Sequence, residues 1–142
     1  MKRWLALLVV GLVLAGLAGT ASRGAQGGKK VENRFFEMRT YYAAPGKMEA
    51  LHTRFREHTN KLFVKHGMTL IGYWTPADSK GAQERLIYIL AYPSKEAREA
   101  SWKAFVSDPD WLAAKAKSEQ GGKLVDRVEP VYMNPTDYSP IK

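Results

Sequence analysis

The chain has 142 residues and a mass of 16.0 kDa, with 45% apolar and 25% charged residues. This length suits one domain, because a single hydrophobic core usually serves about 100–150 residues. A composition so close to the globular average excludes disorder as the main state. The absence of cysteine excludes a disulfide scaffold, a thiol nucleophile and any cysteine-ligated metal.

The N-terminus has the layout of a secretory signal peptide. Two basic residues precede an uncharged, largely apolar run over residues 4–18, which is short for crossing a bilayer, and small side chains follow. We therefore expect residues 1–21 to be a signal peptide, cleaved after Ala21, that exports the protein to the periplasm or the extracellular space. The alternative is an uncleaved N-terminal membrane anchor. Residues 22–33, rich in glycine and basic side chains, are predicted to be a flexible spacer.

The net charge of the whole chain is +8. Removal of residues 1–21 takes away two basic residues and no acidic one, which leaves 20 Lys and Arg against 14 Asp and Glu, or +6. These charges are spread along the sequence, whereas nucleic-acid binding usually needs a basic stripe in a recognisable module. We expect no nucleic-acid partner and, after cleavage, no membrane association.

The first predicted elements are a strand, a helix and a second strand. Residues 34–43 are aromatic and β-favouring, with alternating faces. Pro45 and Gly46 open a helix whose apolar side chains recur at helical spacing, and Gly67 ends it. Residues 68–74 then read as the second strand.

A hairpin connects the second strand to the third. Residues 77–83 contain the polar and glycine residues that are typical of turns, so we expect a loop there. Residues 84–92 follow as a strand. Its middle is almost wholly apolar, which favours a central place in the sheet.

The last elements are an interrupted helix and a fourth strand. Ser94 caps a helix that Asp108, an N-cap residue followed by proline, interrupts and restarts. Two glycines at 121 and 122 stop it, and residues 123–133 form the fourth strand. Pro130 cannot donate a ladder hydrogen bond, so this strand should be an edge or contain a bulge.

The order strand, helix, strand, strand, helix, strand is that of an α+β fold, the ferredoxin-like βαββαβ subunit. Helices cover only one face of such a sheet. With Tyr41, Ile71, Tyr73 and Ile87 or their neighbours on it, the other face would be a larger apolar patch than a monomer normally exposes. We therefore predict a homodimer that packs through the sheet face.

Six segments, taken in order, resemble the NIPSNAP family of the dimeric α+β barrel superfamily. They lie over about residues 34–140, and they are FEMRTY at 36–41, PGK at 45–47, HG at 66–67 with IGYW at 71–74, LAY at 90–92, DPDW at 108–111 and NPTDYSP at 134–140. The chain departs from the family pattern at the hairpin, where Gln83 stands at the usual Asn and Tyr88 close to the usual His. The resemblance implies a dimeric α+β barrel and little about chemistry, although related folds include cofactor-free monooxygenases and haem-handling enzymes.

Three histidines, at 52, 58 and 66, fall on the first predicted helix. Their spacings of six and eight are not the i, i+4 pair that places two metal ligands on one helix face, so we predict no metal site. The simple interpretation is that His66 stabilises the helix C-terminus and His58 lies at the edge of the core. The alternative makes one of them a haem ligand or a proton shuttle.

Charged and aromatic side chains supply the other candidates. Glu37, Arg39 and Tyr41 share a strand face, where they form a structural ion-pair network or anchor an acidic ligand. The larger aromatics are core residues or line an apolar pocket. They are Tyr73, Trp74, Tyr88, Trp102 and Trp111.

We expect a small-ligand binding or interaction module, for an apolar or anionic ligand and without a cofactor. The alternative is a small oxidoreductase of the cofactor-free monooxygenase or haem-handling type, which would use His58, Tyr73, Trp74 and Tyr88. A purely structural dimer is a third interpretation.

Overall fold

A computed structural model of the chain describes residues 34–142. The predicted signal peptide, residues 1–21, and spacer, residues 22–33, lie outside the described residues. Within the described range, no helix is both long and apolar enough to cross a membrane.

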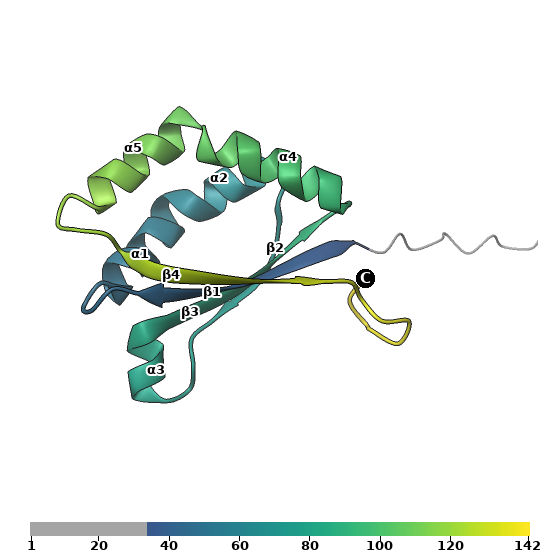
Figure 1. The fold of residues 1–142 in the computed structure, drawn as a ribbon, viewed down its shortest axis with the longest axis horizontal. Helices are drawn as coiled ribbons and strands as arrows, with labels where there is room; N and C mark the ends of the chain where they lie inside the picture. The colour runs from purple at the N-terminus through teal and green to yellow at the C-terminus, as the bar shows by residue number, and fades with distance from the viewer. Residues whose placement is uncertain (1–33) are drawn as a thin grey trace, which may run out of the picture.

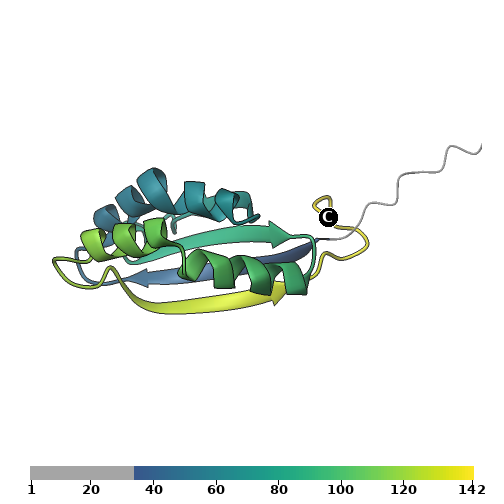
Figure 2. The same cartoon turned by 90° about the horizontal axis from the view of Figure 1, so that it is seen from above.

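The described residues form one four-stranded sheet with most of the helices packed on one of its faces (Figures 1 and 2). Every neighbouring pair of strands is antiparallel, in the order β2-β3-β1-β4. This confirms the predicted α+β class, and β3 is central as expected. The elements are β1 (Phe35–Ala43), α1 (Met48–Arg54), η1 (Phe55–Thr59), α2 (Asn60–Lys65), β2 (Thr69–Trp74), α3 (Ser79–Glu84), β3 (Arg85–Tyr92), α4 (Lys95–Val106), α5 (Pro109–Ser118) and β4 (Val125–Met133).

The first helical segment contains a widened turn that the periodicity did not predict. Between α1 and α2, the residues of η1 form a π-helical turn, and the Thr59 hydroxyl donates a hydrogen bond to the carbonyl of Arg54 at 3.2 Å. Such turns shift the helical register by one residue and frequently lie at functional sites. Here the turn begins at Phe55, which is buried against the sheet.

The hairpin between β2 and β3 is the clearest departure from the predicted elements. Residues 77–83 were expected to be a loop, but Ser79–Glu84 form the short helix α3. Asp78 is its N-cap and accepts a hydrogen bond from the amide of Gly81 at 2.6 Å. The residues that favour turns also favour helix N-termini, which explains the error. α3 lies on the side of the sheet opposite the other helices (Figure 1).

The interrupted helix has the predicted capping. Ser94 accepts from the amide of Ala97 at the start of α4, and Asp108 accepts from the amide of Asp110 at the start of α5. β4 is an edge strand, as Pro130 required.

The face of the sheet opposite α1, α2, α4 and α5 is largely apolar, and we call it the open face. Tyr41 and Tyr73 are not on it, contrary to expectation, because both pack under the helices against Phe55. The strand alternation places apolar side chains of all four strands there, with Trp74 half exposed. They include Phe36, Met38, Ile71, Trp74, Ile87, Ile89 and Val131. At one end, Phe36 and Ile71 line a hollow together with residues of the C-terminal segment between 134 and 141.

Candidate functional site

A fully buried carboxylate anchors the face of β1 that packs under the helices. Glu37 accepts hydrogen bonds from Arg98 at 2.8 and 2.9 Å, from Arg39 at 2.6 Å and from the indole of Trp102 at 2.8 Å. The Tyr92 hydroxyl donates to it at 3.2 Å. Burial alone would raise the pKa of Glu37, but the hydrogen bonds from Arg98 and Arg39 outweigh burial and hold the pKa below its ordinary value. The charges on this strand face are therefore paired.

Next to this network lies a row of three side chains, each of which has one buried polar atom without a partner. Arg39 on β1, Tyr88 on β3 and Tyr73 on β2 are directly opposite one another in the ladder, and we call them the donor row. Among the described residues, the Nε of Arg39 and the hydroxyls of Tyr73 and Tyr88 are buried without a hydrogen-bond partner. Burial raises the pKa of both tyrosines above the ordinary value, so their hydroxyls are protonated donors at neutral pH.

Aromatic rings surround the donor row. Phe55 lies at the centre, with its ring centroid 5.3 Å from Tyr88 and 5.9 Å from both Tyr41 and Tyr73. The guanidinium of Arg39 lies over the ring of Trp102 at 4.3 Å. The π-helical turn therefore inserts Phe55 between the tyrosines, and the space under the helices is filled by packed rings.

The structure brings five of the candidate residues together and places Trp74, His58 and His66 elsewhere. Arg39, Tyr41, Tyr73, Tyr88 and Trp102 form one cluster. Trp74, 49% exposed, covers Gly72 on the open face instead.

Neither His58 nor His66 points into this cluster. His58 is partly exposed and lines an outer groove between η1, α2 and α5. The Nε2 of His66 lies 2.6 Å from the carboxylate of Asp108, the N-cap of α5, so it ties the end of α2 to α5. These two side chains thus do not fit a haem group held between the helices and the sheet. The described residues contain no group of three or more potential metal ligands.

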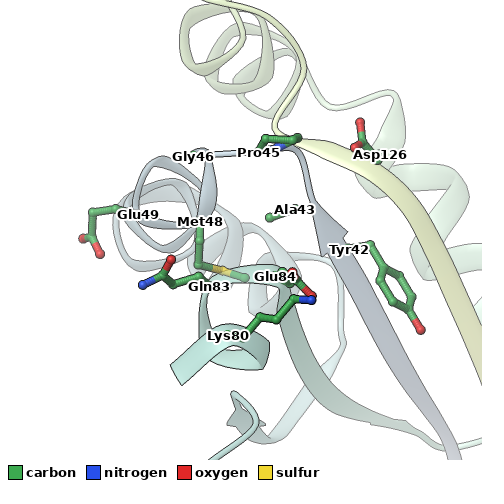
Figure 3. Close-up of a pocket in the computed structure, with 10 residues that line it drawn as sticks. All are labelled: Tyr42, Ala43, Pro45, Gly46, Met48, Glu49, Lys80, Gln83, Glu84 and Asp126. Carbon is green, nitrogen blue, oxygen red and sulfur yellow. The ribbon is translucent and has the colours of Figure 1, made fainter. Parts of the chain in front are cut away.

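Two surface hollows add residues that the sequence did not single out. A hollow of about 620 Å³ lies between the β1–α1 loop, α3 and the start of β4 (Figure 3). It is wide and lined by exposed groups of both signs, including Lys80, Glu84 and Asp126. Gln83, which stands at the family's usual Asn, also lines it.

A smaller cleft of about 310 Å³ lies between α5 and β4, with Tyr41 and Arg54 in its wall. Sequence reasoning missed Arg54, although the signal was present. An arginine at residue 54 falls on the apolar stripe three residues after Leu51, where a charged side chain must be buried with a partner.

The comparisons with known proteins establish the family of the chain. The NIPSNAP family model matches residues 36–140. The chain belongs to the NIPSNAP family. Among curated proteins, no relative matches this chain.

Solved structures of NIPSNAP proteins have the same fold. A NIPSNAP family protein of unknown function from Agrobacterium tumefaciens aligns with a TM-score of 0.67 and 22% identity, over 79% of this chain and 96% of that chain. A NIPSNAP-like domain protein from Burkholderia xenovorans aligns with a TM-score of 0.66 and 20% identity, over 77% and 90%. A second A. tumefaciens NIPSNAP protein has a TM-score of 0.66 and 24% identity, over 77% and 99%. At these identities the likeness shows the fold.

Proposed function

We propose that this NIPSNAP protein binds a small, largely apolar ligand that places an oxygen acceptor on the donor row. The observation that carries the proposal is the coincidence of three buried, unpartnered donors on adjacent strands: the Nε–H of Arg39 and the hydroxyls of Tyr88 and Tyr73. A buried donor without an acceptor costs about 1–3 kcal/mol. Three such donors in one row destabilise the ligand-free protein, and an incoming acceptor would relieve this destabilisation.

The chemistry of the row selects the class of ligand. All three groups can donate, and the arginine is positively charged, so a carbonyl or carboxylate oxygen fits and an ammonium group does not. The walls are rings, namely those of Phe55, Tyr41 and Trp102. A flat, aromatic or unsaturated body would pack against them.

Entry requires a ring to move, because the cluster is closed by its own side chains. Tyr41 lies at the boundary: its ring packs edge-on against Tyr88 at 5.2 Å, and it also lines the cleft between α5 and β4. We propose that the ligand enters past Tyr41.

The test is a titration with three benzene derivatives, followed through the indole N–H of Trp102 in two-dimensional NMR. Acetophenone and benzoate carry an acceptor oxygen, whereas benzylamine carries an ammonium group. Both acceptors should shift the Trp102 signal saturably, because Arg39 lies over that ring at 4.3 Å. Benzylamine should leave it unchanged.

Tyr88→Phe removes one donor and keeps the ring, so we expect it to weaken acetophenone binding by about tenfold. The matched control is Tyr138→Phe, a change of the same kind at an exposed position. Equal binding of all three compounds, or unaltered binding in Tyr88→Phe, would show that the donor row does not select the ligand.

We also propose that the protein is a homodimer in which the open faces of two sheets cover each other. The support is the apolar row Met38, Ile87 and Ile89, which lies on the face of the sheet opposite α1, α2, α4 and α5. Export through residues 1–21 stays a prediction.

A further inference from the structure

The cleft between α5 and β4 contains a second buried arginine with an unused donor. Arg54, at the end of α1, is only 4% exposed and yet lines the cleft. Its Nη1 donates to Glu119 at 2.9 Å and to the Ser118 hydroxyl at 3.3 Å. Its Nε is buried and has no acceptor among the described residues.

The surroundings hold both the backbone and the guanidinium of Arg54. The guanidinium carbon lies over the ring of Trp111 at 5.2 Å, and the backbone carbonyl accepts a hydrogen bond from the Thr59 hydroxyl in the π-helical turn. Trp111 and Tyr41 both line the cleft and give it aromatic walls. A fixed, planar fork of donors with one edge unused is suited to a carboxylate.

The contact with Glu119 already shows that the Arg54 guanidinium can bind a carboxylate. Glu119 follows the last residue of α5 and is partly exposed, so it can move away from Arg54 into water. A carboxylate from outside could replace it, or bind beside it at the free Nε edge.

The other charges of the cleft favour an anion modestly. Lys115 lines the cleft and has no carboxylate within 4.0 Å among the described side chains. Lys123 and Asp126 neutralise each other at 3.0 Å. Arg127 also lines the cleft, but its guanidinium pairs with Glu129 and lies over Tyr42.

We propose that this cleft is a binding site for a small aromatic carboxylate, in which Arg54 holds the carboxylate, in competition with Glu119, and the rings of Trp111 and Tyr41 hold the apolar part. The volume of about 310 Å³ is at the lower end of the range for small-molecule sites, which suits a single-ring compound. The cleft shares Tyr41 with the cluster of rings, but Arg54 and Trp111 belong to neither that cluster nor the donor row, so the site does not rest on the donor row.

The test is a titration with benzoate that follows the indole N–H of Trp111, identified by its loss in Trp111→Phe. We expect a saturable shift with benzoate and none with benzylamine. Arg54→Lys keeps the charge but removes the fork, and should weaken benzoate binding by about tenfold. Glu119→Gln removes the competing carboxylate and should tighten the apparent Kd by about threefold or more.

The chain offers a matched control pair. Arg56 and Glu49 also form an ion pair at 2.9 Å, but on the exposed surface of the first helical segment. Arg56→Lys and Glu49→Gln should leave the benzoate titration unchanged, and melting curves show whether each variant is folded. If Arg54→Lys does not fold, the benzoate affinity of Glu119→Gln tests the proposed site instead.

The two binding proposals fail separately. A benzoate shift at Trp102 without one at Trp111 would overturn the cleft site and leave the donor row. A shift at Trp111 that weakens in Arg54→Lys, together with no response at Trp102, would support the cleft and contradict the donor row. A Glu119→Gln variant that binds benzoate no better than the unchanged chain would show that Glu119 does not occupy the site.

Discussion

Tyr88 and Tyr92 lie four residues apart on the same face of β3, but their hydroxyls have different environments. The Tyr92 hydroxyl donates to Glu37 and accepts from the indole of Trp102 at 2.9 Å. The Tyr88 hydroxyl is buried without a partner among the described residues. Replacing each by phenylalanine therefore removes a hydrogen bond in one case and an unpaired polar atom in the other.

We predict that Tyr88→Phe raises the free energy of unfolding by about 1 kcal/mol, because it removes an unsatisfied buried hydroxyl. Tyr92→Phe should lower it by about 1 kcal/mol. Urea unfolding of the ligand-free protein measures both. A substitution that stabilises the protein while it weakens ligand binding is typical of a binding site. A loss of stability in Tyr88→Phe would indicate that its hydroxyl is satisfied by water.

The buried Glu37 gives the protein a pH dependence whose sign follows from its lowered pKa. The ordinary pKa of a glutamate carboxyl is 4.5, and the pKa of Glu37 in the folded protein lies below it. The stabilisation is therefore complete above about pH 4.5 and is lost as the pH falls through the lower folded pKa.

Glu37→Gln tests this dependence. It leaves Arg39 and Arg98 without their carboxylate, so the free energy of unfolding at pH 7 should be lower by about 3–5 kcal/mol. Its stability should then fall less steeply on acidification than that of the unchanged chain. Parallel stability curves for the two proteins between pH 7 and pH 3 would rule out this role for Glu37.

At the scale of elements, Gly67 ends the first helical segment in a conformation that favours glycine. Its φ is +77°, and a Cβ placed there would meet nothing closer than the Ser101 hydroxyl at 3.8 Å. Gly67→Ala should therefore cost about 1 kcal/mol through backbone strain alone. Gly121→Ala, in the loop after α5 and without a positive φ, should change the unfolding free energy by much less. Equal losses in the two variants would contradict this explanation of the helix end.

The order of the strands and the longer helices, but not the short helix α3, could be predicted from the sequence, because periodicity and caps are local. Ser94, Asp108 and Gly67 each act within a few residues of themselves. It was harder to predict which face of each strand packs against the helices. Alternation assigned Tyr41 to the face of Glu37 and Arg39, but it cannot say which face the helices cover.

The irregularity in β2 explains the error at Tyr73. Pairing shifts between Leu70 and Gly72, so Leu70 and Tyr73 both lie under the helices although they are three residues apart. No local pattern announces such a shift. The donor row, which depends on three strands meeting in register, could not be predicted either.

For the whole molecule, the open face predicts the oligomeric state. In sedimentation at micromolar concentration, the chain without residues 1–21 should be a dimer. Ile87→Lys places a charge on the open face and should give a monomer. Val64→Lys makes the same kind of change at a 59% exposed position on α2 and should leave the dimer intact. A monomeric unchanged chain would show that the open face is not an interface between two copies.

The most direct measurement of the proposed function is a crystal structure of the protein soaked with acetophenone. We predict that the ketone oxygen lies about 3 Å from the Tyr88 hydroxyl and from the Nε of Arg39, with Tyr41 displaced from its position in the closed cluster. Ordered water on these donors, with the ketone absent or bound elsewhere, would contradict the proposal.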